Sequence, residues 1–325
     1  DESFIADAVM LGDEEISGGW MILKPTVVGN RSFIGNGAYV PDGTTIPDGV
    51  LIGVQSKAPE HQINEGETWF GSPPIRLPAR EKMEGFTEGL TFKPTLIRRI
   101  ARGLIEAMRV VLPLALTIGV GYMVVLSVID ITEKSGWLAG FGMLILSGLL
   151  YGIGCFIFVG LLKWILIGRY KPKSVPMWTL FVWLSEAVTS LHESVSVPNF
   201  LNYLRGTPFL PMMFRLMGTK IGKQVYLDTT DITEYDCVEI GDHAELNSFC
   251  GPQTHLFEDR IMKIGNVIIG DRVTISARSI ILYHAEVGCD AYLGPLTLVM
   301  KGEQIPAASA WTGSPAVPWR KAAVK

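Results

Sequence analysis

The chain has 325 residues, of which 48% are hydrophobic, and it carries a formal net charge of −4. This length allows two or three domains, and the mild negative charge gives no indication of nucleic-acid binding. The apolar excess lies between about residues 104 and 170, whereas both ends have the composition of soluble domains. Neither an initiator methionine nor a signal peptide opens the chain, so we expect it to start inside a longer protein.

The cysteines follow no metal-binding or disulfide pattern. They are Cys155, Cys237, Cys250 and Cys289, and no two of them have CxxC spacing. We therefore expect reduced thiols facing the cytosol and predict no metal site. Cys250 is interpreted as a packed thiol, because no basic residue adjoins it in sequence.

A period of six residues dominates residues 1–80. Nine apolar residues recur at this spacing: Phe4, Met10, Ile16, Ile22, Val28, Ile34, Val40, Ile46 and Ile52. This period suits neither an α-helix nor an alternating strand. It fits a triangular prism in which each short side takes one hexapeptide and points its apolar residue inward. We therefore predict a first left-handed parallel β-helix lobe over residues 1–80, with its opening coils upstream of this chain.

Two uncharged segments follow a basic linker or helix over residues 81–103. Residues 110–129 and 137–162 contain no charged side chain, and seven residues join them. Each segment can cross a hydrocarbon core ~30 Å thick at ~1.5 Å per residue. Gly148 and Gly152 form a GxxxG pair, which permits close helix packing. We predict two transmembrane helices within residues 104–170.

Basic residues flank this hairpin at its two outer ends. They are Arg98, Arg99, Arg102, Arg109, Lys163, Arg169, Lys171 and Lys173. The short connection has only Lys134, beside two acidic residues. The positive-inside rule therefore predicts a multi-pass protein of the cytoplasmic membrane with both lobes in the cytosol.

Residues 171–219 are apolar and aromatic but interrupted by charges and prolines. No window here spans a bilayer. We predict amphipathic helices at the membrane interface, where His192 would lie. The alternative is a helical cap packed on a β-helix.

The six-residue period returns in residues 220–325. Seven positions are apolar: Ile269, Ile275, Ile281, Val287, Leu293, Val299 and Ile305. This region ends with "AWTGSPAVP" (310–318), and the first lobe ends similarly with "TWFGSPPIR" (68–76). The fold class is therefore mainly β with membrane α-helices: two left-handed parallel β-helix lobes joined by a transmembrane helical hairpin.

The second repeat breaks from about residue 250 to residue 264, and the break contains "QTHLFEDR" (253–260). The extra residues must leave the prism. This segment resembles the hexapeptide acyltransferases of the maltose and xenobiotic acetyltransferase type. Those enzymes carry Thr-His in a loop, then acids, then a coil such as "IIGDRVTI" (268–275). The resemblance implies that His255 is a general base, a role that suits a near-neutral imidazole. The alternative is a solvated histidine.

Further site candidates follow from this assignment. Glu258 or Asp259 could orient the His255 ring, and Asn247 could steady the base or an oxyanion. Candidate substrate contacts are Thr254, Asp228, Asp231, Glu234 and Trp311. The acidic run over residues 228–236 could attract a cationic substrate or form a solvated turn.

His243 and His284 fall at coil corners, where exposure is expected. The first lobe has no counterpart of Thr254-His255, so we predict that it is non-catalytic. Acetyltransferases of this superfamily build sites between neighbouring prisms, and tandem lobes could do so within one chain.

The complete arrangement resembles one family in particular. The motifs are "RGTPFLP", "LDTTDITEYD", "QTHLFEDR", "LVMKGE" and the two exits "WFGSPPIRLP" and "WTGSP". They are similar to the C-terminal membrane region of nonribosomal peptide synthetases of the epsilon-poly-lysine synthetase type. In that family, adenylation and carrier domains precede a membrane region that joins aminoacyl units.

The resemblance implies a membrane-bound acyltransferase that makes a homopoly(amino acid) or short peptide. Its donor would be an aminoacyl thioester on the phosphopantetheine of a carrier protein, with no tightly bound cofactor, and its acceptor would be an amine. The implied partners are the carrier and adenylation domains, the lipid bilayer and a possible second copy of the chain. The alternative function is a non-catalytic scaffold that anchors the synthetase and assists assembly or product export.

Overall fold

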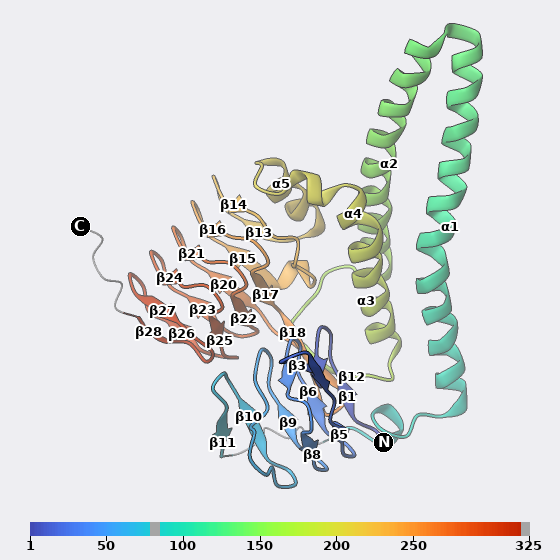
Figure 1. Ribbon diagram of the computed structural model, residues 1–325. Helices are drawn as coiled ribbons and strands as arrows, with labels where there is room; N and C mark the ends of the chain where they lie inside the picture. The colour runs from blue at the N-terminus through green and yellow to red at the C-terminus, as the bar shows by residue number, and fades with distance from the viewer. Residues whose placement is uncertain (79–84, 320–325) are drawn as a thin grey trace.

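The computed structural model describes residues 1–78 and 85–319. Two stacks of short parallel strands lie beside a pair of long helices that projects away from them (Figure 1). The first stack, here the first lobe, comprises residues 4–77, and the second lobe comprises residues 220–318.

The first lobe contains one five-stranded sheet and two parallel strand pairs. The sheet contains β1 (Phe4–Ile5), β6 (Phe33–Ile34), β9 (Leu51–Ile52), β10 (Thr68–Phe70) and β11 (Ile75–Leu77), and only β11 is antiparallel to its neighbour. The pairs are β2 (Met10–Leu11) with β7 (Tyr39–Val40), and β5 (Val27–Val28) with β8 (Thr45–Ile46). The predicted inward positions Ile34, Val40, Ile46 and Ile52 are fully buried.

The start of this lobe departs from the six-residue period. β3 (Glu15–Ser17) and β4 (Trp20–Ile22) form an antiparallel hairpin rather than a coil. Gly18 and Gly19 both have positive φ, 57° and 82°, which closes a two-residue turn. Ile16 and Ile22 in this hairpin are 72% and 39% exposed, and Met10 before it is 54% exposed, so the prediction that these three residues point inward is wrong.

The second lobe is a prism with three faces. The first face contains β13 (Lys220–Ile221), β15 (Val238–Ile240), β20 (Val267–Ile269), β23 (Glu286–Val287) and β26 (Gln304–Ile305). The second contains β14 (Tyr226–Leu227), β16 (Glu245–Leu246), β21 (Thr274–Ile275), β24 (Tyr292–Leu293), β27 (Ala310–Thr312) and β28 (Val317–Pro318). The third contains β17 (Gly251–Gln253), β22 (Ile280–Leu282) and β25 (Leu298–Val299).

The side chains of this prism follow the sequence pattern closely. The six-residue positions from Ile269 to Ile305 are at most 2% exposed, and they form one apolar column. His243 and His284 are exposed residues at turns with φ of 58° and 62°. All four cysteines are free, and Cys250 is buried.

The two long helices are α1 (Leu96–Ser135) and α2 (Trp137–Leu166), preceded by the short turn η1 (Glu88–Leu90). They pack side by side (Figure 1). Both are long and apolar enough to cross a membrane, judged by length and composition. α1 begins at Leu96, so the last part of the segment expected to be a basic linker or helix is helical.

Residues 171–219 contain a strand as well as helices. β12 (Lys173–Pro176) precedes α3 (Leu180–Leu191), the π-helical turn η2 (His192–Ser196), α4 (Val197–Asn199), η3 (Leu201–Leu204) and α5 (Phe209–Met217). α3 and α5 bury one face in the same apolar core as the second lobe. The opposite face of α5 exposes Phe209, Met212 and Leu216. The segment therefore caps the second lobe and also presents an apolar surface.

The two lobes contact each other at their matching exits. The Ser72 amide donates a hydrogen bond to the Ser314 carbonyl at 2.9 Å. Phe70 packs in one apolar cluster with Leu256, Leu282 and Leu298 of the second lobe. At Gly71, φ is +94° and an added Cβ would lie 2.7 Å from the Ser314 carbonyl oxygen, so this close approach requires glycine.

Candidate active site

The break in the second repeat folds as a β-hairpin. β18 (His255–Glu258) pairs antiparallel with β19 (Ile261–Ile264), and β12 adds a third strand beside β19. Phe257 stacks on Phe4 of the first lobe with ring centroids 5.7 Å apart. At the tip, Arg260 donates from Nη2 to the Ser3 carbonyl at 3.2 Å. The hairpin is thus fixed between the second lobe, the first lobe and the segment that leads into α3.

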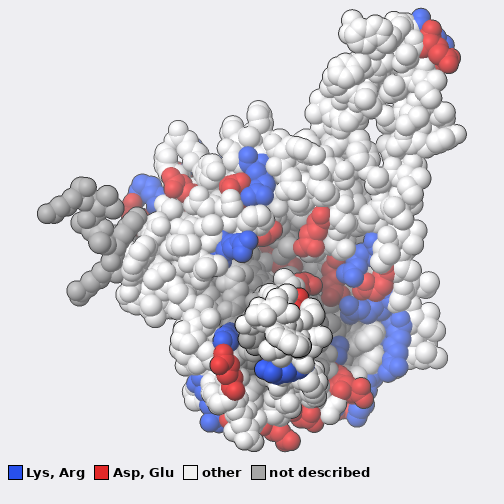
Figure 2. Space-filling view, viewed as in Figure 1, with Lys and Arg blue, Asp and Glu red and all other residues white. Residues whose placement is uncertain are grey.

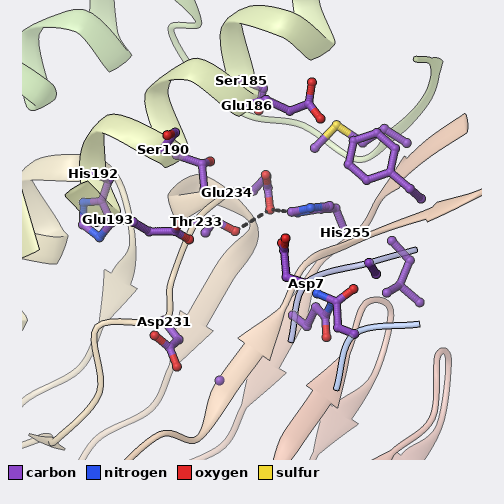
Figure 3. Close-up of a pocket in the computed structure, with 18 of the residues that line it drawn as sticks. Asp7, Ser185, Glu186, Ser190, His192, Glu193, Asp231, Thr233, Glu234 and His255 are labelled. Carbon is purple, nitrogen blue, oxygen red and sulfur yellow. Dashed lines mark hydrogen bonds and ion pairs between the residues drawn. The ribbon is translucent and has the colours of Figure 1, made fainter. Parts of the chain in front are cut away.

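A cavity of about 630 Å³ opens beside this hairpin. Its lining comes from the start of the first lobe, α1, the α3–η2 helix, the loop over residues 230–234 and the hairpin itself. The space-filling view shows acidic and basic side chains around this hollow (Figure 2). His255 begins the hairpin and faces the cavity beside Glu234 (Figure 3).

His255 and Glu234 form a directly bonded pair. Nδ1 of His255 lies 2.7 Å from Oε2 of Glu234. The same carboxylate oxygen accepts hydrogen bonds from the hydroxyls of Thr254 at 2.5 Å and Thr233 at 2.8 Å. Glu234 is completely buried, whereas 23% of the His255 side chain is exposed. The glutamate therefore supports the imidazole from behind, and the ring is the member of the pair that substrate can reach.

The pair shifts the pKa of both members. Desolvation by the cavity walls would lower the pKa of His255, but the Glu234 carboxylate, with Glu186 and Asp7, raises it above its ordinary value. Burial would raise the pKa of Glu234, but His255 and the two threonine hydroxyls lower it. Each group thus stabilises the charged form of the other.

The structure places the other predicted catalytic residues outside the cavity lining. Glu258 accepts hydrogen bonds from Lys263 at 2.7 Å and Lys301 at 3.3 Å. Asp259 occupies the hairpin turn with φ of 53°. Asn247 donates from Nδ2 to the Ile275 carbonyl at 2.9 Å, inside the coil. Glu234, which the sequence assigned to substrate, occupies the orienting position expected for Glu258 or Asp259.

Among the predicted substrate contacts, Asp231 lines the cavity. Asp228 pairs with Arg205 at 3.0 Å. Thr254 is buried behind Glu234. Trp311 donates to Ser309 Oγ at 2.9 Å in the exit. Burial raises the pKa of the Cys250 thiol to about 12, which agrees with its interpretation as a packed thiol.

Several cavity residues had no signal in the sequence. Glu186 and Glu193 come from α3 and η2, and Asp7 comes from the first lobe. Arg102 of α1 donates to Glu186 at 3.0 Å and lines the same cavity. These residues come from three separate segments, namely the first lobe, α1 and the α3–η2 helix, so only the tertiary arrangement brings them to His255. Within the described ranges, no group of at least three His, Cys, Asp or Glu side chains could hold a metal ion.

The arrangement suits proton transfer at a nucleophile. A carboxylate on Nδ1 holds the imidazole in the tautomer whose Nε2 has a free lone pair, as in the Ser-His-Asp triad. Such a histidine can accept a proton from an attacking amine or hydroxyl.

No protein-family model matches this chain. It is 67% identical over 320 residues, or 98% of its length, to delta-poly-L-ornithine synthetase from Acinetobacter baumannii (strain AB307-0294). The match covers 24% of that protein, so the chain spans about a quarter of its relative's length. The resemblance to a poly-amino-acid synthetase that the sequence motifs indicated is thereby confirmed.

Solved structures with some similarity to parts of this chain include two acetyltransferases. A hexapeptide-repeat-containing acetyltransferase from Vibrio cholerae is 16% identical, with a TM-score of 0.31, 37% of this chain covered and 83% of the other. A galactoside acetyltransferase in complex with coenzyme A is 14% identical, with a TM-score of 0.32, 37% of this chain covered and 74% of the other. These scores are low, and the fold described above rests on its own strand pairing.

Proposed function

We propose that this chain forms amide bonds within a poly-amino-acid synthetase. It would transfer an aminoacyl group from the phosphopantetheine thioester of a carrier protein to an amine. The observation that carries this proposal is the His255–Glu234 pair, which faces a cavity walled by both lobes and by the helices. The similarity to delta-poly-L-ornithine synthetase supports a cationic amino acid as the monomer.

In the proposed reaction, the amine nitrogen attacks the thioester carbonyl carbon. Nε2 of His255 accepts the proton that the amine loses, while Glu234 holds Nδ1 and stabilises the imidazolium. The C–N bond forms as the C–S bond breaks, and the imidazolium returns the proton to the leaving thiolate. A positioned base of this kind contributes typically ~10²–10⁴-fold to the rate.

The first lobe would complete the site rather than catalyse. Phe4 stacks on the hairpin residue Phe257, and Asp7 lines the cavity. In this proposal both lobes coil in the left-handed sense, and the tandem arrangement supplies within one chain the neighbouring prism that the related acetyltransferases take from another subunit. The donor is delivered by carrier and adenylation domains of the same synthetase.

The proposal also includes a membrane location. α1 and α2 would cross the cytoplasmic membrane as a hairpin, with both lobes on the cytosolic side. The apolar face of α5, with Phe209, Met212 and Leu216, would contact the membrane interface.

The direct test is amide-bond formation by the purified chain in lipid nanodiscs, given a separately loaded aminoacyl carrier protein and the matching free amino acid. Mass spectrometry should detect a new amide-linked product that is absent without the chain. A folded, membrane-inserted chain that produces no amide from any cationic aminoacyl carrier would contradict the enzyme proposal. That outcome would favour the second candidate, a non-catalytic anchor, for which the apolar outer surface of α1 is the supporting observation.

A further inference from the structure

We propose that Arg278 and Arg205, whose guanidinium groups lie over the Phe249 ring, form a subsite for the phosphate of the phosphopantetheine arm. This inference rests on the proposed function. It adds the residues that recognise the donor, and it places the carrier protein at this corner of the second lobe.

Two arginines meet at one aromatic ring. Phe249 occupies a coil corner with φ of 56° and is 59% exposed. The guanidinium carbon of Arg205 lies 5.2 Å from the ring centroid, and that of Arg278 lies 5.9 Å from it. Both distances are within the range of a cation–π contact. The ring thus holds two groups of the same charge near one another, which favours an anion beside them.

One of the two arginines is engaged and the other is available. Arg205 donates to Asp228 Oδ1 at 3.0 Å and to the Asp228 carbonyl at 2.9 Å. Arg278 is exposed, and over residues 1–78 and 85–319 its side chain has neither an ion-pair partner within 4.0 Å nor a hydrogen bond. Asp228 therefore fixes Arg205 in place, and Arg278 beside it is free to bind an anion.

This corner belongs to the rim of the cavity at which the two lobes meet. Phe249 lines the cavity, and so does Asn36 of the first lobe. The Asn36 carbonyl accepts a hydrogen bond from the Gln55 amide at 2.9 Å. Gln55 in turn donates from Nε2 to the Arg278 carbonyl at 3.4 Å. The arginine corner is thus connected to the cavity from both lobes.

A continuous wall leads from this corner to the proposed base. β17 follows Phe249 and runs into β18, which begins at His255 (Figure 1). All three residues of β17, Gly251–Gln253, line the cavity. At ~3.3 Å per residue, the chain from Phe249 to His255 extends over at most roughly 20 Å. An extended phosphopantetheine arm can span this distance, so a phosphate at the corner leaves the thioester at the imidazole.

The chemistry of the two ends agrees with this direction. The planar guanidinium fork matches the geometry of phosphate oxygens. The exposed corner also suits a phosphate that remains linked to a carrier protein outside the cavity. Further inside, Glu186, Glu193 and Asp231 line the cavity and would repel a phosphate. The uncharged pantetheine part of the arm is therefore the part that enters.

The test compares phosphopantetheine with pantetheine, which lacks only the phosphate. Binding to the full chain in phosphatidylcholine nanodiscs is measured by isothermal titration calorimetry at low ionic strength, where screening is weak. The wild type should bind phosphopantetheine more tightly. Arg278→Gln should weaken that binding by roughly tenfold, since a hydrogen bond to a charged group typically contributes that much, and should leave pantetheine binding unchanged. Arg278→Lys should recover part of the loss.

The matched control is Arg272→Gln. Arg272 is also exposed at a coil turn of the second lobe, with φ of 54°, but it is paired with Asp290 at 2.7 Å. This variant should bind phosphopantetheine as the wild type does. In a coupling assay with a loaded carrier, Arg278→Gln should raise KM and leave kcat unchanged, because the phosphate contact is the same in the ground state and the transition state.

The outcomes separate this inference from the proposed function. Equal binding of the two probes by the wild type, or equal losses in the Arg278 and Arg272 variants, would overturn the phosphate subsite even if amides form. Inorganic phosphate that competes as well as phosphopantetheine would show a general anion site and would also contradict the proposal. Arg278-dependent phosphopantetheine binding without any amide product would support the subsite and contradict the coupling function.

Discussion

At the scale of single residues, the basicity of His255 depends on a carboxylate that is itself held in place. Three hydrogen bonds converge on Oε2 of Glu234, from Thr233, Thr254 and His255. Hydrogen bonds to a carboxylate favour its charged form, and the charged form in turn favours a protonated imidazole. The Glu234 carboxylate thus makes the His255 imidazole a stronger base.

Replacing Glu234 tests this relation through the pH dependence of the rate. Glu234→Gln keeps the shape but removes the charge that raises the pKa of His255. The pKa should fall, so the acid limb of the kcat/KM profile should move to lower pH while the maximal rate decreases. A profile measured from about pH 5 to pH 9 covers the range in which a histidine titrates. An unchanged acid limb would show that the contact is only structural.

The sequence was informative about His255 and uninformative about its partner. His255 stands in a break of a regular repeat, beside the Thr-His order of related enzymes. Glu234 lies 21 positions earlier, and its neighbours Asp228 and Asp231 have the same charge. The sequence does not show that Glu234, rather than either aspartate, contacts His255. That contact depends on how the chain folds at η4 (Tyr235–Cys237), directly after Glu234.

At the scale of elements, α2 is joined to the second lobe by a buried ion pair. Lys163 is fully buried near the end of α2, and its Nζ lies 2.7 Å from Oδ2 of Asp236. The Tyr170 amide donates to the same oxygen at 3.1 Å. The pair thus fixes the base of the long helix to the loop that also positions Glu234.

Removing the cation from this pair should be costly. Lys163→Ala leaves Asp236 without its buried partner, and breaking such a pair typically destabilises by about 3–5 kcal/mol. Chemical unfolding of the chain in detergent, followed by tryptophan fluorescence, measures the change. Lys134→Ala is the matched control, because its pair with Asp130 is exposed and should contribute at most ~1 kcal/mol. Equal stability of the two variants would contradict the anchoring role.

Periodicity predicted some elements well and others poorly. The positions from Ile34 onward are buried as the six-residue pattern requires. The pattern failed at Ile16 and Ile22, because the Gly18-Gly19 turn forms a hairpin there while the apolar spacing continues, and it also failed at Met10, which is exposed. It also gave no sign of β12, which pairs with the hairpin strand β19 far along the chain.

At the scale of the whole molecule, the lobes lie at one end of the two long helices, and a small charged tip lies at the other end. The tip contains Asp130, Glu133 and Lys134, and charged side chains are visible at the far end of the projecting helices (Figure 2). Between the lobes and the charged tip, the outer surface of α1 is largely apolar and exposed. This distribution fits helices that cross a membrane and expose their connection on the opposite side from the lobes.

A cysteine at the tip tests this orientation. Ser135→Cys should react with a membrane-impermeant thiol reagent on intact cells, because the connection would face outward. The unsubstituted chain, whose Cys155, Cys237 and Cys250 are buried, provides the background. Labelling that requires permeabilised cells would place the tip in the cytosol and reverse the proposed topology.

The central claim is that His255 is the base for amide formation, and the single-turnover rate of His255→Ala with a preloaded carrier tests it most directly. The rate should fall by roughly 10²-fold or more, with little change in folding, because the residue lies on the hairpin outside the prism core. His243→Ala and His284→Ala, at exposed corners, should react at the wild-type rate. A folded His255→Ala chain that couples as fast as the wild type would contradict the account.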